Sequence, residues 1–128
     1  MRFLLDTQLV VWLPAGDPRV SHTTRSLLKN AEHEFLFSTV SLWELAIKRG
    51  IGKLDKRIDL KELRSSMLTR GYSELPVLGS HALAVEALPL LHKDPFDRIL
   101  IAQATVEGIT LLTADKQIAR YPGPVRKV

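Results

Sequence analysis

Short apolar runs alternate along this chain with longer segments of helical periodicity, and this alternation limits the folds open to it. RFLL at 2–5, EFLFS at 34–38 and ITLL at 109–112 have the length of strands. They are apolar without a polar face, as strands buried on both sides of a sheet are. Strands that alternate with helices form βαβ units around a parallel sheet. We therefore predict an α/β fold.

The boundaries of the expected elements follow from turn and cap residues. Gly50, Gly71 and Gly108 are expected helix stops, and Asp59 with Glu62 is an expected helix start. Strands are expected at 2–5, 34–38, 74–78, 109–112 and, at an edge of the sheet, 125–128. Helices are expected at 7–13, 21–31, 41–49, 59–70, 80–87, 95–107 and 116–121.

Length and composition favour one domain. A chain of 128 residues, 45% of them hydrophobic, supports one core and is too short for two ordinary domains. We predict a single domain over 1–128. The lack of cysteine excludes disulfides, thiolate zinc sites and cysteine nucleophiles. No apolar stretch approaches the roughly 20 residues of a membrane span, and MRFLLD reaches an aspartate too early for a signal peptide. We expect a cytoplasmic protein without a membrane partner.

The charge balance favours an anionic partner. Eighteen Lys and Arg against 14 Asp and Glu give a net charge of +4, and the isoelectric point is near 9.6. A modest basic excess of this kind is compatible with nucleic-acid binding.

Four acidic residues lie where an apolar run gives way to a helical segment. They are Asp6, Glu44, Asp97 and Asp115. In a parallel α/β sheet the carboxyl ends of the strands share one edge, and ligands bind outside that edge. These acids are therefore expected to converge, although they are spread over more than 100 residues.

Each acid also has a purely structural interpretation. Asp6 and Asp115 are suited to cap the helices that follow them. Ser41 and Glu44 fit a capping box, and Asp94-Pro95 fits the start of a helix. Four caps do not explain why all four acids recur at the same kind of junction.

A shared cation explains the set better. Ionising neighbouring carboxylates costs free energy unless positive charge lies between them. Mg²⁺ and Mn²⁺ prefer oxygen ligands, and Mg²⁺ held by few carboxylates keeps several waters. Such a metal activates water and stabilises the leaving oxygen of a phosphodiester. The residues therefore indicate phosphodiester hydrolysis.

Four ordered motifs resemble the PIN-domain family, and within it the VapC-type toxins of toxin-antitoxin modules. They are LLDT, STVSLWELAIK, HKDPFDRILIAQA and GITLLTADKQIARY, and they span nearly the whole chain. The resemblance implies a three-layer α/β/α sandwich with a central parallel sheet of four to five strands. It also implies an endoribonuclease that depends on Mg²⁺ or Mn²⁺, is usually a homodimer, and is inhibited by a cognate antitoxin protein.

The resemblance assigns metal binding and catalysis to Asp6, Glu44, Asp97 and Asp115. Thr7 and Thr113 are expected to hydrogen-bond and orient these acids. At position 8 the chain has Gln, where relatives of this subgroup often have His. An auxiliary histidine at this position is therefore missing, but all four acids are present.

Other residues are weaker candidates. Lys48, Arg49 and Lys53 belong to a basic segment, completed by Lys56 and Arg57, that either grips RNA or is a solvated loop. Arg98, like Lys93, is suited to contact a phosphate or to pair with a carboxylate. His92 is a possible general acid or a surface residue. Trp12 and Trp43 are expected in the core or in a dimer interface rather than stacked on bases.

Other classes fit less well. A receiver domain needs paired acids after the first strand, and a haloacid-dehalogenase-like phosphatase needs D-x-D, where this chain has Asp6-Thr7-Gln8. A non-catalytic RNA-binding or antitoxin-binding module would not need all four acids. A deoxyribonuclease of the same fold is the nearest alternative, because no residue visibly checks for a 2′-hydroxyl.

Overall fold

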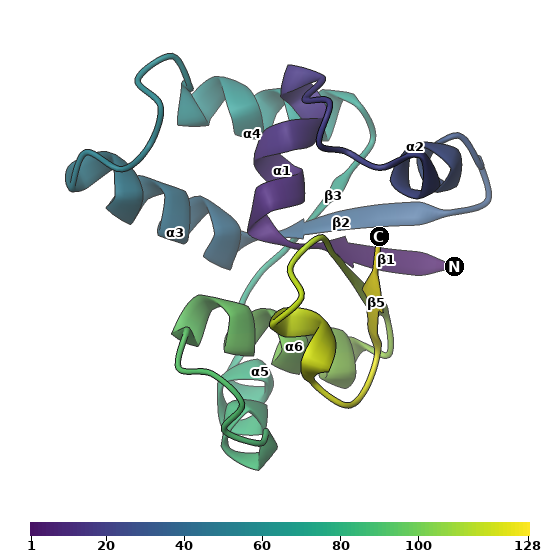
Figure 1. The fold of residues 1–128 in the computed structure, drawn as a ribbon, viewed down its shortest axis with the longest axis vertical. Coiled ribbons are helices and arrows are strands. Elements are labelled where there is room, and N and C mark those ends of the chain that lie inside the picture. Colours follow the sequence, from purple (N-terminus) through teal and green to yellow (C-terminus); the bar gives the residue numbers. More distant parts are fainter.

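The computed structural model describes all 128 residues and is built on a parallel sheet of five strands in the order β3-β2-β1-β4-β5 (Figure 1). The strands are β1 Arg2–Leu5, β2 Glu34–Ser38, β3 Ser73–Leu75, β4 Thr110–Thr113 and β5 Val125–Lys127. Leu4 of the central strand pairs with Leu36 on one side and Leu111 on the other. Because all strands run the same way, their carboxyl ends share one edge.

Helices cover both faces of this sheet, so the predicted three-layer α/β/α sandwich is confirmed (Figure 1). On one face lie α1 Thr7–Ala15, α2 His22–Leu28, α3 Thr39–Gly50 and α4 Leu60–Thr69. On the other lie α5 Gly79–Ala84 and α6 Pro95–Glu107. Short 3₁₀ turns occur at Val85–Ala87 (η1) and Ile118–Arg120 (η2).

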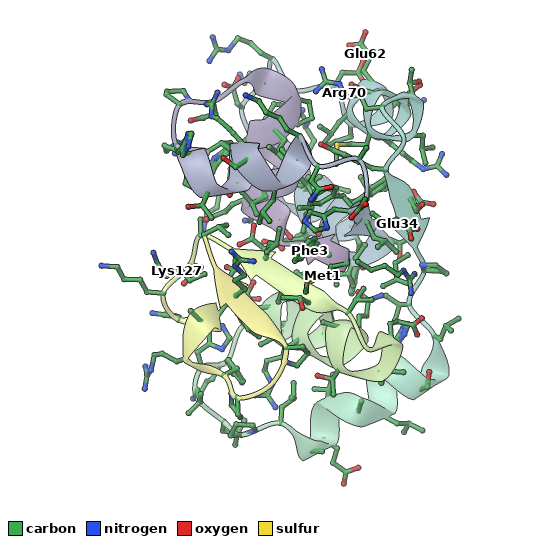
Figure 2. The ribbon with its side chains drawn as sticks, turned by 90° about the vertical axis from the view of Figure 1, so that its right-hand side faces the viewer. Met1, Phe3, Glu34, Glu62, Arg70 and Lys127 are labelled. Carbon is green, nitrogen blue, oxygen red and sulfur yellow. The ribbon has the colours of Figure 1, made fainter.

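The core has two halves because successive residues of a strand point to opposite faces. Phe3 and Leu5 are fully buried with Leu9, Val10 and Met67 beneath α1 and α4. Leu4 and Leu111 instead pack with apolar residues of α6. Figure 2 shows the contrast with the surface, where Lys127 extends outward from β5. The continuous apolar runs thus become strands buried on both faces.

Most expected boundaries agree with the structure to within two residues, and the exceptions have local causes. The bounds of β1, β2 and α6 are as predicted. Helix α2 ends at Leu28 rather than at 31, because Asn30 begins a turn by accepting from the Glu32 amide. Strand β3 ends at Leu75 rather than at 78, since Pro76 follows it. The expected helix at 116–121 is reduced to η2.

Helix α3 begins two residues before its expected start. Ser38, not Ser41, is the N-cap, and its hydroxyl accepts from the Val40 amide at 3.0 Å. The proposed Ser41–Glu44 capping box is therefore wrong, and both side chains are available for other contacts. No helix in the chain is both long enough and apolar enough to cross a membrane.

Candidate active site

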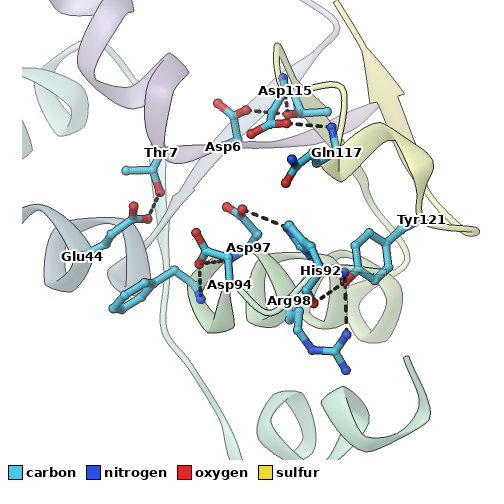
Figure 3. Close-up of polar contacts among 12 residues, drawn as sticks. Asp6, Thr7, Glu44, His92, Asp94, Asp97, Arg98, Asp115, Gln117 and Tyr121 are labelled. Carbon is cyan, nitrogen blue, oxygen red and sulfur yellow. Dashed lines mark hydrogen bonds and ion pairs between the residues drawn. The ribbon is translucent and has the colours of Figure 1, made fainter. Parts of the chain in front are cut away.

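The four predicted acids line one cavity at the carboxyl edge of the sheet. The cavity has a volume of about 430 Å³, and Asp6, Glu44, Asp97 and Asp115 all contribute to its wall. Figure 3 shows them converging from β1, α3, α6 and the segment after β4. The predicted convergence is confirmed, including for Asp97, which a long loop after η1 brings to this edge.

Asp6 is both a helix cap and a wall residue of the cavity. One carboxylate oxygen, Oδ1, accepts from the Leu9 amide at 2.9 Å. The other, Oδ2, accepts from the Thr113 hydroxyl at 2.6 Å and the Ala114 amide at 3.2 Å. Burial raises the pKa of Asp6, although these three hydrogen bonds oppose the rise. The predicted contact between Thr113 and an acid is confirmed.

Thr7 orients Glu44 across the space between α1 and α3. Its hydroxyl donates to Glu44 Oε1 at 2.9 Å and lies 2.9 Å from the Ser41 hydroxyl. Because the Thr7 proton is used by Glu44, the Ser41 hydroxyl donates to Thr7. Glu44 Oε2 forms an ion pair with Lys48 at 2.8 Å, one helical turn later. The predicted hydrogen bond from Thr7 to an acid is confirmed.

Asp97 lies in the first turn of α6 among other charged groups. Burial, reinforced by the nearby Asp94 and Glu44 carboxylates, raises the pKa of Asp97 to about 7, against the lowering effect of His92. His92 Nε2 is 3.1 Å from Asp97 Oδ2. The N-cap of α6 is Asp94, whose Oδ1 accepts from the Phe96 and Asp97 amides at 2.9 and 3.3 Å. Capping therefore accounts for Asp94 and leaves Asp97 unexplained.

Asp115 extends the acidic wall on the side of Asp6. Its backbone amide donates to the Thr113 hydroxyl oxygen at 2.9 Å, so one threonine connects both acids. Its Oδ1 accepts from the Gln117 amide at 2.7 Å, which stabilises the turn into η2. The predicted helix cap at Asp115 is wrong, because Gln117 is the N-cap of η2. Asp115 Oδ2 has no hydrogen-bond partner within the protein.

The donor set suits a hard divalent cation that keeps part of its water shell. Every candidate ligand is a carboxylate, and Lys48 is the only Lys or Arg side chain that forms an ion pair with any of the four acids. No three Asp, Glu or His side chains are close enough together to form a ready metal cage. Mg²⁺ fits this arrangement, since it is usually bound by one or two carboxylates and several waters.

The basic candidates differ in their access to the cavity. Lys48 and Lys53 line it together with Arg19. Arg49 is half-buried and donates to the Ile58 carbonyl, outside this cavity. Lys48 is partly engaged by Glu44, whereas Lys53 is exposed and has no acidic partner.

Arg98 is not available to a phosphate, so its predicted RNA contact is wrong. The residue is only 8% exposed and donates to the carbonyls of Pro89, Val85 and Leu88. It also donates to the Tyr121 hydroxyl at 3.1 Å. Its guanidinium fixes the loop before α6 from inside.

The tryptophans also differ from expectation. Trp43 is 61% exposed and meets Phe96 edge-on, so the predicted core position is wrong, and its packing in a dimer stays a prediction. Trp12 is half-buried on the cavity wall, with the Arg19 guanidinium 4.6 Å above its ring.

Sequence reasoning underrated two residues of the site. The sequence left His92 as either a general acid or a surface residue, but its ring bridges Asp97 and Tyr121. Asp94 was assigned only to a cap, but it also lines the cavity. Both residues lie in the segment HKDPFD beside Asp97, and this proximity in the sequence was the available signal that they belong to the site. The Tyr121 contact, 29 residues away, had no local signal.

Comparison with known proteins agrees with this geometry at the level of the fold. Several solved structures superpose over nearly the whole chain. One is VapBC2 from Rickettsia felis bound to a promoter DNA fragment, with TM-score 0.73, 20% identity, and coverage of 99% of this chain and 98% of that one. Another is DNA-bound VapBC from Salmonella typhimurium, with TM-score 0.69, 16% identity, and coverage of 99% and 98%.

A third similar structure is VapBC-5 from Mycobacterium tuberculosis, described as a member of the VapBC family of toxin-antitoxin systems. It has TM-score 0.60 and 18% identity, and the match covers 99% of this chain and 97% of that one. No curated protein matches the chain. The family model of the PIN domain, however, matches residues 3–124. With this match over nearly its whole length, the chain belongs to the PIN-domain family.

Proposed function

We propose that this PIN-domain protein is a metal-dependent endoribonuclease and the toxin of a toxin-antitoxin pair. The observation that carries the proposal is the convergence of Asp6, Glu44, Asp97 and Asp115 on one cavity. Only Glu44 among them has a Lys or Arg partner. Buried or half-buried carboxylates that share a cavity wall without basic partners favour a cation as their missing counter-charge.

Asp6, Asp97 and Asp115 would hold the Mg²⁺ or Mn²⁺ ion, directly or through water. When bound, such an ion supplies a water of lowered pKa and stabilises charge on the phosphate and the leaving oxygen. Asp6 offers the one lone pair that Oδ1 keeps beside its bond from the Leu9 amide, since Oδ2 accepts from two donors. Asp97 and Asp115 each keep one carboxylate oxygen that bonds to no protein group.

Glu44 is suited either to complete the metal site or to take a proton from the attacking water. Thr7 holds Oε1, so the carboxylate is fixed in orientation. Lys48 neutralises Oε2 and lines the same cavity. A proton acceptor must lie within hydrogen-bond reach of the reacting water, and Glu44 would meet this condition for a water held in the cavity that it lines. The reaction proceeds without a covalent enzyme intermediate.

RNA is proposed as the substrate, and a cognate antitoxin as the protein partner. The superposed structures are VapBC complexes, and one is described within a family of toxin-antitoxin systems. We extend this partnership to the present chain, with a homodimeric toxin acting in the cytoplasm. The net charge of +4 also favours an anionic substrate. Lys48 and Lys53 are the proposed RNA contacts at the cavity, and Arg49, between them in the sequence, is a proposed contact outside the cavity.

The test is cleavage of a mixture of total RNA and single-stranded DNA by the purified protein with EDTA, Mg²⁺ or Mn²⁺. Asp97→Asn serves as the control for contaminating nucleases. We expect RNA fragments that require the metal and are absent with Asp97→Asn. If only DNA were cut, the proposed active site would stand, but the protein would be a deoxyribonuclease. If neither nucleic acid were cut in a metal-dependent way and calorimetry showed no Mg²⁺ binding, the protein would be a non-catalytic binding module.

A further inference from the structure

A hydrogen-bonded chain that becomes fully buried at Tyr121 leads away from the acidic cavity through His92. Its ring bonds to Asp97 Oδ2 through Nε2 at 3.1 Å and to the Tyr121 hydroxyl through Nδ1 at 2.7 Å. The Tyr121 hydroxyl in turn accepts from Arg98 Nη1 at 3.1 Å. Figure 3 shows His92 between Asp97 and Tyr121, with Arg98 below Tyr121. None of the steps proposed above uses His92, Tyr121 or Arg98.

The donors around Tyr121 fix the direction of these bonds. Its hydroxyl oxygen already accepts from Arg98 and from the His92 backbone amide at 3.2 Å. Neither group can be an acceptor, and a hydroxyl has two acceptor lone pairs and one proton. A protonated Nδ1 of His92 would be a third donor to the same oxygen. The His92 backbone carbonyl, 3.2 Å from the same hydroxyl, is a second acceptor within reach of its proton. If the proton went to that carbonyl, an unprotonated Nδ1 would lie 2.7 Å from the oxygen with no hydrogen between them. Nδ1 therefore accepts the Tyr121 proton, and the ring hydrogen lies on Nε2, facing Asp97.

The far end of the chain is held firmly. Tyr121 is 4% exposed and packs in the apolar half of the core beneath α6. Arg98 is fixed by backbone carbonyls of η1 and of the loop that follows, including Pro89 at 2.7 Å. A side chain locked by packing and by several hydrogen bonds transmits its orientation to the group it contacts.

We infer that His92, set in its Nε2–H tautomer by Tyr121 and Arg98, is a positioning residue for the Asp97 carboxylate. It bonds to Oδ2 and so leaves Oδ1, which has no protein partner, to the cavity and to a metal. The inference rests on the proposed function, because it presumes a metal at Asp97. Groups that orient a metal ligand typically change metal affinity or activity by about 10- to 100-fold when they are removed.

A different interpretation is that His92 only ties the loop before α6 to η2. Two pairs of variants separate the interpretations. Tyr121→Phe removes one hydroxyl and keeps the ring, and Tyr72→Phe is the matched control, since Tyr72 is the only other tyrosine and lies outside the cavity. His92→Gln keeps an N–H donor near the position of Nε2, whereas His92→Phe keeps the ring shape without a donor.

The first readout is the tautomer, measured by ¹H–¹⁵N correlation of the histidine rings in metal-free protein. His92→Gln identifies the His92 signals among those of the four histidines. We expect the Nε2–H tautomer in the wild type and in Tyr72→Phe, and a mixture with Nδ1–H in Tyr121→Phe. An Nδ1–H tautomer in the wild type would overturn the inference.

The second readout is Mn²⁺ affinity, measured from the spin-resonance signal of free Mn²⁺, with RNA cleavage beside it. Tyr121→Phe and His92→Phe should bind Mn²⁺ about 10-fold more weakly or worse, with Tyr72→Phe unchanged and His92→Gln close to the wild type. Thermal unfolding identifies any variant that fails to fold. If His92→Phe does not fold, the comparison of Tyr121→Phe with Tyr72→Phe still tests the inference.

The outcomes separate the inference from the proposed function. Wild-type Mn²⁺ affinity in Tyr121→Phe and His92→Phe would overturn the positioning role and leave the nuclease intact. Equal weakening in His92→Gln and His92→Phe would also overturn it, because the loss would then not depend on the donor. A wild-type protein that neither binds Mn²⁺ nor cuts RNA would remove the proposed function, and the inference with it.

Discussion

At the scale of single residues, the acids of the cavity carry structural and chemical roles together. Asp6 caps α1 through Oδ1 and accepts from Thr113 through Oδ2. Each carboxylate oxygen has two lone pairs, and Oδ2 uses both because it also accepts from the Ala114 amide, but Oδ1 keeps one for a cation. Capping and metal binding are therefore compatible at Asp6. At the start of α6 the two roles belong to different residues: Asp94 is the N-cap, and Asp97 is the proposed metal ligand.

The raised pKa of Asp97 predicts how the metal-free protein responds to pH. The pKa is about 7 in the folded chain against an ordinary value of 3.8. Between these values the folded state keeps a proton that the unfolded state has lost, so stability falls as pH rises from about 4 to 7. The shift sets an upper limit of about 4 kcal/mol, and partial exposure of the carboxyl reduces this to about 1–2 kcal/mol.

Asp97→Asn should remove this penalty. In EDTA we expect the variant to be more stable than the wild type above pH 7 and equal to it below pH 4, as measured by urea unfolding across the pH range. Added Mg²⁺ should stabilise only the wild type. A variant that is less stable than the wild type at pH 8 would mean that the carboxylate is already compensated within the protein.

Thr113 offers a second test at this scale. Thr113→Val removes the donor to Asp6 Oδ2 and the acceptor of the Asp115 amide while nearly keeping the shape. Loss of these buried partners should lower stability by about 1–3 kcal/mol and raise the pKa of Asp6 further. Urea unfolding measures the loss. Thr110→Val, on the same strand and without a side-chain hydrogen bond, is the control, and an equal loss there would contradict the role of the hydroxyl.

At the scale of elements, local signals set boundaries well where caps and stops were unambiguous. Helix α6 was predicted from Asp94-Pro95 to Gly108, and the αL conformation of Gly108, with φ of 66°, explains its stop. Helix α3 was misplaced because Ser41 and Glu44 imitate a capping box, while the β-branched Thr39 and Val40 resemble strand residues. The real cap, Ser38, is also the last residue of β2.

The same contrast applies to the site. The four acids were predictable because each lies near a junction between elements, and a parallel sheet brings such junctions to one edge. The contact of His92 with Tyr121 spans 29 residues and depends on how the loop before α6 packs. The burial of Arg98 depends on carbonyls supplied by that loop. Tertiary packing of this kind leaves no periodic trace in the sequence.

The corrected start of α3 is testable. Ser38→Ala removes the N-cap and should lower stability by about 1 kcal/mol. Ser41→Ala should lower it less, because the Thr7 hydroxyl still donates to Glu44 and leaves no buried group unpaired. Urea unfolding of both variants gives the order. If Ser41→Ala were the more damaging, the hydrogen bond between Ser41 and Thr7 would contribute more to stability than the Ser38 cap, which would contradict this order.

At the scale of the whole molecule, charge is separated between an acidic cavity and a basic surface. The chain carries a net charge of +4, although carboxylates dominate the cavity wall. Arg19, Lys48 and Lys53 line the same cavity. A metal between acid and phosphate, with lysines holding the flanking nucleotides, uses both signs of charge.

The salt dependence of RNA binding tests this division. Each lysine that contacts a phosphate of single-stranded RNA adds about 0.7 to the slope of log affinity against log salt concentration. Lys53 is exposed and has no acidic partner, so Lys53→Gln should reduce the slope by about this amount without changing stability. Lys29→Gln, at an exposed position outside the cavity, should leave the slope unchanged. Fluorescence anisotropy in the Asp97→Asn background measures binding without cleavage. Equal losses in the two variants would mean that RNA is held by diffuse charge, whereas a loss confined to Lys53 would place the strand across the acidic cavity.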